Sequence, residues 1–252
     1  MLFRSLIDLC DEVHIQTNRS GEVIRAFGDY AVPAERDLVV RAARLLQQHT
    51  GVAAGARIGV KKSIPLGSGL GGGSSDAATT LLALNHLWST GLDGVELSRL
   101  GASLGADIPV FVQGRSAVAH GIGDELAPVQ LGQRFYVLVF PGFPVSTAEV
   151  FNHPDLMRES ARIGLAQALA GEGRNDCQPV AEALHPSLAA IVQALRQWGN
   201  PRLTGTGSCI FLQMTDENAA ISAAQEIKCR YNVRAVRGVD RSPMHTVLAQ
   251  LP

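Results

Sequence analysis

The sequence predicts an α+β protein in which strands and helices are mixed along the chain and divided between two domains. Stretches in which apolar residues alternate with polar ones, such as 55–64, are typical of half-buried strands. Stretches with apolar residues at helical spacing, such as the one after Pro33, are typical of helices that pack on one face. The pattern changes near residues 130–145, from glycine-rich loops to alternating helices and strands. This change predicts a domain of residues 1–135 and a domain of residues 136–252.

The composition narrows the class of protein. The chain has 252 residues, of which 46% are hydrophobic and 18% charged, enough for a sizeable core. Its formal net charge of -1 gives no case for binding nucleic acid or an anionic membrane. No apolar run reaches the roughly 18 residues of a membrane span. Acidic residues at Asp8, Asp11 and Glu12 argue against a signal peptide, and four widely spaced cysteines without a CxxC pair favour reduced thiols. We expect a cytoplasmic protein.

The first part of the chain, up to residue 104, is predicted to combine strands and helices. Val13 and Ile15 alternate with polar neighbours, as in a strand. Asp37 is a plausible N-cap for the next helix, and the run DAATTLLALNHLW is typical of a buried helix that Gly91 ends. In order, we expect a strand at 6–17, a hairpin punctuated by Gly21 and Gly28, a helix after Pro33, a strand at 55–64, a loop at 65–75, and helices at 76–88 and 94–104.

From residue 108 onward, strands and helices are predicted to follow one another. The apolar run FYVLVF, ended by Pro141, is typical of a buried strand. In order, we expect strands at 108–113, 116–119 and 134–140, a helix at 147–171 with a break near Pro154, and a helix at 180–198 with Pro186 as a kink or start. A loop leading into a strand follows at 203–212, then a helix at 216–229 and a strand at 232–239.

The loop between the strand at 55–64 and the next helix is the most informative segment. Five glycines stand within Gly67–Gly73, and glycines let a backbone turn tightly and approach a ligand closely. The helix that follows offers unpaired N–H groups and a positive dipole end, which together favour phosphate. The expected phosphate-binding residues are Pro65, Leu66, Gly67, Ser68, Gly69, Leu70, Gly71, Gly72, Gly73, Ser74 and Ser75. The hydroxyl of Ser74 or Ser75 could also bind Mg2+, and Lys61 and Lys62 could add positive charge.

Other interpretations of this loop are weaker. A flexible linker would be flanked by polar spacer, whereas this loop lies directly between a strand and a helix. A Walker loop needs a Lys after its last glycine, and none is present. A dinucleotide fingerprint is formally met by Gly67, Gly69 and Gly72, but Asp93, the acid at the expected distance, lies in a turn between two helices.

The segment PLGSGLGGGSSDAA resembles the second motif of the GHMP kinase superfamily. Its continuation, TTLLALNHLW, is particularly similar to the 4-diphosphocytidyl-2-C-methyl-D-erythritol kinases. The segments ERDLVVRAARLL, GADIPVF and LTGTGSCIF also occur in the order of that family, and the resemblance covers nearly the whole chain. It implies two α+β domains with the active site in the cleft between them.

The resemblance also assigns roles to residues. Asp107 of GADIPVF matches the catalytic Asp, which accepts the proton of the substrate hydroxyl or orients it. On local grounds alone Asp107 would be a turn residue or a helix cap. Gly205, Thr206 and Gly207 of LTGTG match a loop that packs beside the phosphate loop, although in isolation they would be an ordinary turn. Asn175 and Asp176 match a segment to which we assign no role.

The implied reaction is the phosphorylation of a small molecule. The family transfers phosphate from ATP, with Mg2+, to the 2-hydroxyl of 4-diphosphocytidyl-2-C-methyl-D-erythritol, a step of the non-mevalonate route to isoprenoid precursors. The expected partners are this substrate and ATP, without nucleic acid or membrane, in a monomer or homodimer. A GHMP kinase for another small alcohol, such as homoserine or mevalonate, is the related alternative.

The resemblance begins after the family's PAKxNL strand and GYH segment. We therefore expect the family's first motif to be missing, either because Met1 is an internal methionine of a longer protein or because the protein is shorter than its family and impaired. The family's Lys in that motif contributes charge next to the catalytic Asp. A catalytically impaired nucleotide-binding protein is accordingly the alternative from a different functional class.

Overall fold

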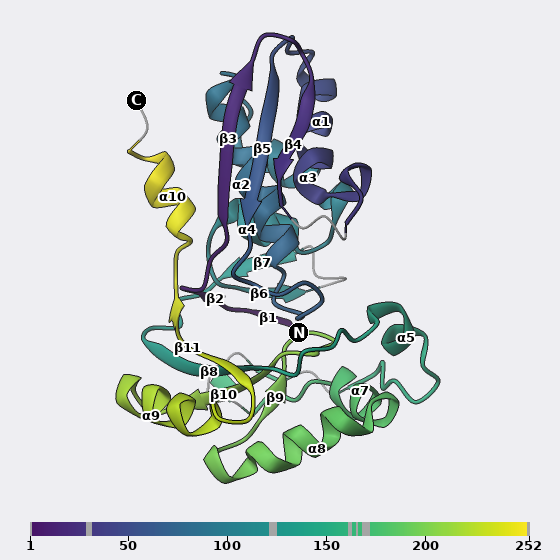
Figure 1. The fold of residues 1–252 in the computed structure, drawn as a ribbon, viewed down its shortest axis with the longest axis vertical. Helices are drawn as coiled ribbons and strands as arrows, with labels where there is room; N and C mark the ends of the chain where they lie inside the picture. The colour runs from purple at the N-terminus through teal and green to yellow at the C-terminus, as the bar shows by residue number, and fades with distance from the viewer. Residues whose placement is uncertain are drawn as a thin grey trace.

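The computed structural model describes residues 2–28, 32–120, 125–160, 163–164, 166–167 and 172–250. Its elements form an upper and a lower half in Figure 1. The strands are β1 (Leu2–Arg4), β2 (Leu6–Ile7), β3 (Glu12–Asn18), β4 (Val23–Phe27), β5 (Gly55–Lys61), β6 (Ala117–His120), β7 (Glu125–Pro128), β8 (Arg134–Phe140), β9 (Arg202–Leu203), β10 (Ile210–Met214) and β11 (Asn232–Val239). The helices are η1 (Ala34–Arg36), α1 (Leu38–Thr50), α2 (Gly72–Leu87), α3 (Gly94–Leu104), α4 (Ile108–Gln113), α5 (Thr147–Asn152), α7 (Cys177–Leu184), α8 (Pro186–Leu195), η2 (Arg196–Trp198), α9 (Glu217–Ile227) and α10 (Pro243–Leu248).

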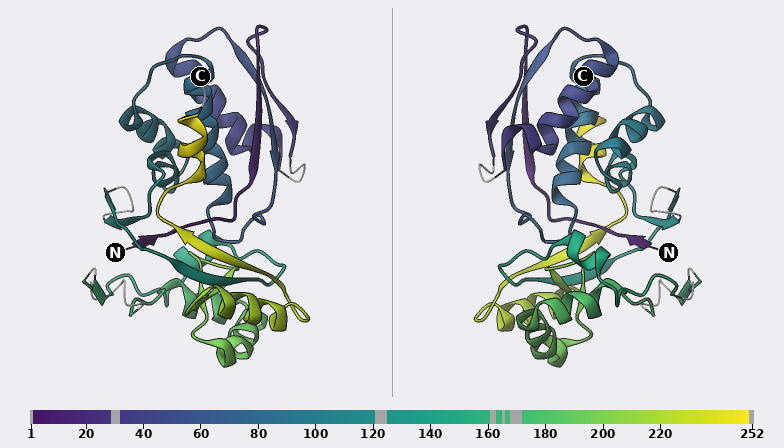
Figure 2. Two further views of the ribbon diagram at one scale, coloured as in Figure 1. Left: turned by 90° about the vertical axis from the view of Figure 1, so that its left-hand side faces the viewer. Right: turned by 90° about the vertical axis from the view of Figure 1, so that its right-hand side faces the viewer.

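The upper half is a three-stranded sheet with helices on one face. Its strand order is β3-β5-β4, and the side views show α1, α2 and their neighbours on one side of it (Figure 2). Ile58 of β5 is fully buried in the core that it forms with the apolar faces of α1 and α2, which include Leu46 and Leu81. Asp37 caps α1 as predicted, because its carboxylate accepts a hydrogen bond from the Val39 N–H at 3.2 Å.

The lower half is a five-stranded sheet of order β2-β11-β8-β10-β9. Side chains of β8 alternate between its two faces, as a strand requires. Val137 and Val139 point into the core shared with α7, α8 and α9, whereas Tyr136, Leu138 and Phe140 form a second cluster on the opposite face. That opposite face supports the glycine-rich loop, as described below.

The chain passes between the halves at both of its ends. Strand β2 pairs with β11 in the lower sheet, while β1 pairs with β6 in a separate sheet of order β1-β6-β7 between the halves (Figure 1). Helix α10 returns to the upper half, where the His245 ring lies 3.0 Å from the Val112 carbonyl oxygen. The α+β class with two parts is confirmed. The boundary at residues 135 and 136 stays a prediction.

One predicted strand is a helix. Residues 108–113 form α4, with Pro109 near its first turn and Gly114 in the left-handed conformation just after its end. A short apolar run does not distinguish a strand from a buried helix. Proline decides it here, because proline suits the start of a helix and cannot donate a hydrogen bond within a sheet. Ile108, at the start of α4, packs against Gly101 of α3.

The predicted hairpin around Gly21 and Gly28 is also wrong. β3 and β4 are separated in the sheet by β5, which pairs antiparallel with β3 and parallel with β4. Opposite pairs such as Val13 with Val60 bring apolar side chains together on one face. Two glycines in sequence mark possible turns but do not say which strands pair, because cross-strand contacts between distant residues contribute to that choice.

Several predicted boundaries move. The strand at 6–17 is two strands in different sheets, because the chain turns between β2 and β3. The helix at 180–198 begins at Cys177 and is interrupted at His185, after which Pro186 starts α8 as predicted. Of the helix at 147–171, α5 ends at Asn152, and part of the range lies outside the described residues.

Candidate active site

The glycine-rich loop connects β5 to α2. Gly67, Gly69 and Gly71 all adopt left-handed backbone conformations, with φ of 68°, 72° and 71°. L-residues with a side chain avoid this conformation, so the alternating glycines define the path of the loop. Helix α2 begins at Gly72, which places Gly73, Ser74 and Ser75 in its first turn instead of in the loop. The N–H groups of Gly73 and Ser74 therefore lie at the open N-terminus of the helix, the arrangement that favours an anion, whereas the Ser75 N–H already donates to the Gly71 carbonyl at 2.9 Å.

The two glycine-rich loops identified in the sequence pack against each other. The Ser68 carbonyl accepts hydrogen bonds from the Thr204 hydroxyl at 2.8 Å and from the Cys209 N–H at 3.2 Å. The approach is so close that a Cβ atom on Gly69 would lie 2.3 Å from the Thr204 carbonyl oxygen. Residues 67–69 and 204–209 thus form one structure, although they come from opposite halves of the chain.

The lower sheet supports the glycine-rich loop from below. Leu70 packs against the cluster of Tyr136, Leu138 and Phe140 on the upper face of that sheet. This contact buries apolar surface of the loop, while the neighbouring Leu66 remains 48% exposed. The loop is therefore anchored at Leu70 and at Ser68. Gly67 and Gly69 remain exposed, whereas Gly72 at the start of α2 is buried.

Asn175 holds the second glycine-rich loop in place. Its side-chain amide donates to the carbonyl oxygens of Gly205 at 2.6 Å and Leu203 at 3.0 Å. Thr206 is buried, and its hydroxyl lies within hydrogen-bond distance of the Thr147 hydroxyl, at 3.0 Å. This bond ties the loop to the start of α5. These bonds account for an Asn at this position, to which the sequence alone assigned no role.

Asp107 lies at the start of α4, next to the first turn of α2. A Cβ atom on Gly105 would lie 3.9 Å from the Ser74 hydroxyl oxygen, which places the 105–107 turn beside the phosphate loop. The Asp107 side chain makes no capping hydrogen bond to α4. Its carboxylate instead contacts the Arg4 guanidinium at 2.5 Å and is 36% exposed. Asp107 thus occupies the N-cap position that its local sequence predicts, but its side chain forms no capping hydrogen bond.

A buried charge cluster lies on the other side of α2. Lys62 Nζ contacts Asp11 Oδ2 at 2.5 Å and Asp76 Oδ2 at 2.8 Å, and the two carboxylates are almost fully buried. Asp11 also accepts the N–H groups of Ser63 and Ile64 at 2.6 and 2.8 Å, which fixes the start of the glycine-rich loop. Burial raises the pKa of Asp76 to about 6, although the nearby Lys62 opposes this rise. The same carboxylates raise the pKa of Lys62 despite its burial.

Of the two lysines expected to add positive charge near the phosphate loop, only Lys62 lies beside it. Lys62 is engaged by Asp11 and Asp76 beside the loop. Lys61, the last residue of β5, points instead toward the exposed Glu12 at 3.0 Å. Because side chains alternate along a strand, two successive lysines cannot both face the loop.

Comparison with known proteins identifies the family. Residues 37–115 match the model of the GHMP kinases N terminal domain, and residues 155–233 match that of the GHMP kinases C terminal domain. The 4-diphosphocytidyl-2-C-methyl-D-erythritol kinase of Halorhodospira halophila is 44% identical over 248 residues, covering 97% of this chain and 86% of the relative. That of Nitrosococcus oceani is 46% identical over 217 residues, covering 86% of this chain and 78% of the relative.

This chain belongs to the 4-diphosphocytidyl-2-C-methyl-D-erythritol kinase family.

Solved structures agree with the assignment to this kinase family. A crystal structure of 4-(cytidine 5'-diphospho)-2C-methyl-D-erythritol kinase matches with a TM-score of 0.79 and 31% identity over 92% of this chain and 88% of that one. A homoserine kinase from Cytophaga hutchinsonii matches with a TM-score of 0.67 at 20% identity, over 94% of this chain and 89% of that one, which shows the shared fold alone. The chain is a small-molecule kinase of the GHMP class.

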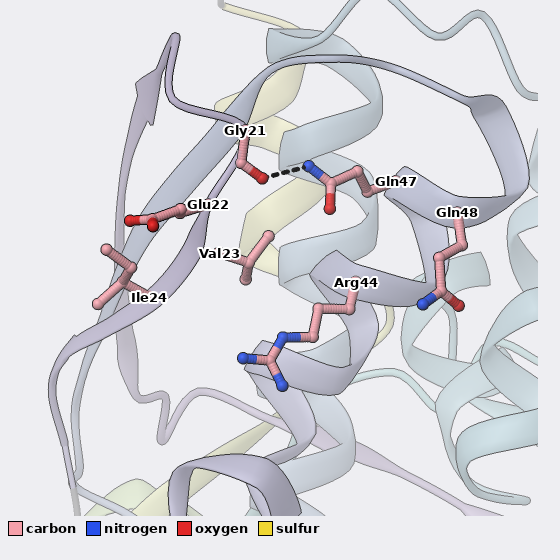
Figure 3. Close-up of a pocket in the computed structure, with 7 residues that line it drawn as sticks. All are labelled: Gly21, Glu22, Val23, Ile24, Arg44, Gln47 and Gln48. Atoms are coloured by element: carbon pink, nitrogen blue, oxygen red, sulfur yellow. Dashed lines mark hydrogen bonds between the residues drawn. The ribbon is translucent and has the colours of Figure 1, made fainter.

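A shallow hollow lies far from these loops. It has a volume of about 490 Å³ and lies between β4 and α1, at the end of the upper half farthest from the lower sheet (Figures 1 and 3). Gln47 crosses it to donate to the Gly21 carbonyl at 2.8 Å. The residues that line it are Gly21, Glu22, Val23, Ile24, Arg44, Gln47 and Gln48.

Two features of the described residues concern the membrane and the metal ion. Within the described ranges, no helix has the length and apolarity to cross a membrane. The same ranges contain no group of three or more His, Cys, Asp or Glu side chains arranged to hold a metal ion. A magnesium ion in a kinase is held largely by nucleotide phosphates and water, so it does not require such a group.

The sequence did not reveal several residues of this site. Arg4 carried no motif, and the pairing of Asp11 with Lys62 and Asp76 joins positions far apart in the chain. One signal was available for Asp76: an acidic residue inside an otherwise Ala- and Leu-rich helix predicts a buried partner of opposite charge. The sequence contained no comparable signal for Arg4.

Proposed function

We propose that this kinase transfers the γ-phosphoryl group of ATP to the 2-hydroxyl of 4-diphosphocytidyl-2-C-methyl-D-erythritol, in the non-mevalonate route to isoprenoid precursors. The observation that carries the proposal is the junction of the two glycine-rich loops at Ser68 and Thr204, with the Asp107 turn beside the first turn of α2. The names of relatives that are 42–46% identical supply the substrate.

The glycine-rich loop would bind the phosphates of ATP. Gly67 and Gly69 leave the backbone of the loop exposed, and an anion at the N-terminus of α2 would accept from the first N–H groups of that helix. The residues proposed for this role remain Pro65, Leu66, Gly67, Ser68, Gly69, Leu70, Gly71, Gly72, Gly73, Ser74 and Ser75. Gly205, Thr206 and Gly207 would form the adjoining wall of the site.

Asp107 would act on the substrate hydroxyl. The hydroxyl oxygen forms a bond to the γ-phosphorus, the bond from that phosphorus to the bridging oxygen breaks, and ADP leaves. The hydroxyl proton passes to the Asp107 carboxylate and from there to water. The 36% exposure of this carboxylate leaves it accessible to a bound alcohol.

The first turn of α2 offers suitable donors for Mg2+. Within the described part of the chain, the hydroxyls of Ser74 and Ser75 make no hydrogen bond, and oxygen ligands are those that Mg2+ prefers. Either serine would hold the ion together with nucleotide phosphates. The ion would neutralise part of the charge on the transferring phosphoryl group.

We also propose that the reaction takes place in the cytoplasm. Cys10, Cys177, Cys209 and Cys229 are all free thiols, in keeping with a reducing cytoplasm. A monomer or a homodimer remains the expectation, with ATP and the small-molecule substrate as the partners.

A substrate panel tests the proposal. The purified protein is incubated with ATP and Mg2+ and with either 4-diphosphocytidyl-2-C-methyl-D-erythritol, homoserine or mevalonate, and ADP release is followed. We expect release with the first compound alone. Release with another alcohol would assign a different GHMP substrate. ATP binding without release from any of them would support a nucleotide-binding protein that lacks turnover.

A further inference from the structure

The carboxylate of Asp107 is not fixed by its own helix. An N-cap carboxylate ordinarily accepts the N–H of the second or third helical residue. In α4 the second residue is Pro109, which has no N–H, and the side chain of Asp107 makes no capping bond. A proton acceptor in phosphoryl transfer needs a fixed geometry relative to the attacking hydroxyl. Another group must therefore hold this side chain.

Arg4 is in position to do so. Its Nη2 lies 2.5 Å from Asp107 Oδ1, and among the described residues no other group forms a hydrogen bond or an ion pair with that carboxylate. The two side chains are 28% and 36% exposed, so the pair is only partly open to solvent.

The backbone on both sides of this pair is firmly held. Arg4 lies opposite Ala117 in the β1–β6 pair, and β6 follows α4 in the chain, so Arg4 and Asp107 belong to one connected unit. The fully buried Ser116 reinforces this unit, because its hydroxyl accepts the Leu6 N–H at 3.0 Å and donates to the Val239 carbonyl at 3.0 Å.

The arginine is not placed for stability alone. Its Nε is buried and has no hydrogen-bond partner within the described residues. A buried donor without an acceptor is unfavourable for folding. Residues that violate such a local rule are expected at functional sites.

We propose that Arg4 is a positioning residue for the phosphoryl transfer, and that its guanidinium orients the Asp107 carboxylate toward the substrate hydroxyl. This inference rests on the proposed function of Asp107. A planar guanidinium fixes a carboxylate better than an ammonium group does, so Arg4→Lys should support catalysis only in part.

The test compares Arg4→Gln, Arg4→Lys, Asp107→Asn and the double variant Arg4→Gln/Asp107→Asn. We expect Arg4→Gln to lower kcat by about 10- to 100-fold, with the KM for ATP and the thermal unfolding temperature unchanged. Arg4→Lys should recover part of kcat. In the Asp107→Asn background, Arg4→Gln should have no further effect, because the two residues act as a unit.

A matched control removes a different ion pair. Arg237 contacts Glu217 at the same 2.5 Å, but in the lower half, and Arg237→Gln should leave kcat unchanged. If Asp107→Asn lowers kcat and Arg4→Gln does not, or if the two effects multiply in the double variant, the role of Arg4 is overturned. If Asp107→Asn itself retains the parent kcat, the catalytic assignment of Asp107 fails instead.

Discussion

The Thr204 hydroxyl donates a hydrogen bond of 2.8 Å to the carbonyl oxygen of Ser68, joining two glycine-rich loops that are far apart in the sequence. The bond lies where the two halves of the molecule meet. The shape of the phosphate loop therefore depends on residues of the lower half. Substitutions at Gly69 and at Asn175 test this dependence.

Gly69→Ala should separate the two loops. A Cβ atom there would lie 2.3 Å from the Thr204 carbonyl oxygen and 2.8 Å from that of Gly207, and backbone atoms cannot yield as a flexible side chain would. The clash and the strain of a left-handed alanine should together lower the free energy of unfolding by about 3 kcal/mol. We also expect a large loss of ATP affinity, because the phosphate loop would shift. Urea unfolding and calorimetry measure the two effects.

Gly51→Ala is the matched control for this substitution. Gly51 has a φ of 70°, close to the 72° of Gly69, but nothing lies within 4 Å of its added Cβ. We expect only the strain of the left-handed conformation, about 1 kcal/mol, with unchanged ATP affinity. Equal effects of the two substitutions would show that contact between the loops is unimportant.

Asn175→Ala should loosen the second glycine-rich loop. The substitution leaves the carbonyl oxygens of Leu203 and Gly205 without their amide donor. We expect a loss of about 1 to 3 kcal/mol in stability and weaker ATP binding, because the wall of the proposed site moves. Asn218→Ala, on the exposed surface of α9, serves as the control and should change neither quantity. Parent-like ATP affinity in Asn175→Ala would contradict the coupling.

Lys62→Met should destabilise the protein far more than Lys61→Met. Lys62 balances two almost fully buried carboxylates, and removing one partner of a buried ion pair costs about 3 to 5 kcal/mol. Lys61 pairs with the exposed Glu12, and such surface pairs contribute little. Chemical denaturation of the two variants in parallel measures the difference, and similar midpoints would refute the account of this cluster.

Asp76 should make stability depend on pH. Its pKa in the folded protein is about 6, raised by burial above its ordinary 3.8, so the folded protein retains a proton that the unfolded chain has released between these values. The free energy of unfolding contributed by this group therefore falls as pH rises through that window and stays low above it. The fall is about 2 to 3 kcal/mol.

The Asp76→Asn variant isolates this contribution. Asparagine does not titrate, so the stability of the variant minus that of the parent should increase as pH rises from about 4 to about 7, whatever constant offset the substitution adds. Urea unfolding at a series of pH values gives this difference. A difference that does not change with pH would mean that Asp76 is ionised throughout.

The sequence predicted those parts of the fold for which local chemistry decides. Asp37 caps α1, Pro186 starts α8, and the apolar run 134–140 is a buried strand, because a cap, a proline and a continuous apolar run act over a few residues. Residues 108–113 were assigned to the wrong class because the apolar run IPVFV fits both strand and helix, although Pro109 suits the first turn of a helix and not the interior of a sheet.

The part of the candidate site that the sequence predicted is the glycine-rich loop. Gly67, Gly69 and Gly71 take the conformations that only glycine adopts readily, and such a requirement is visible in the sequence. The partners of Asp107 and Lys62 were not visible, because an ion pair between distant residues depends on the tertiary fold alone. Arg4 and Asp11 became identifiable only once β1 and the start of β3 were placed beside the upper helices.

The most direct test of the central claim is a comparison of ATP binding and phosphoryl transfer in the parent and in Asp107→Asn, with 4-diphosphocytidyl-2-C-methyl-D-erythritol as the acceptor. We expect the variant to bind ATP as the parent does and to release ADP about 100-fold more slowly or worse, since a positioned proton acceptor contributes that much to the rate. A variant that turns over at the parent rate, or a parent that binds ATP and never phosphorylates this acceptor, would contradict the account.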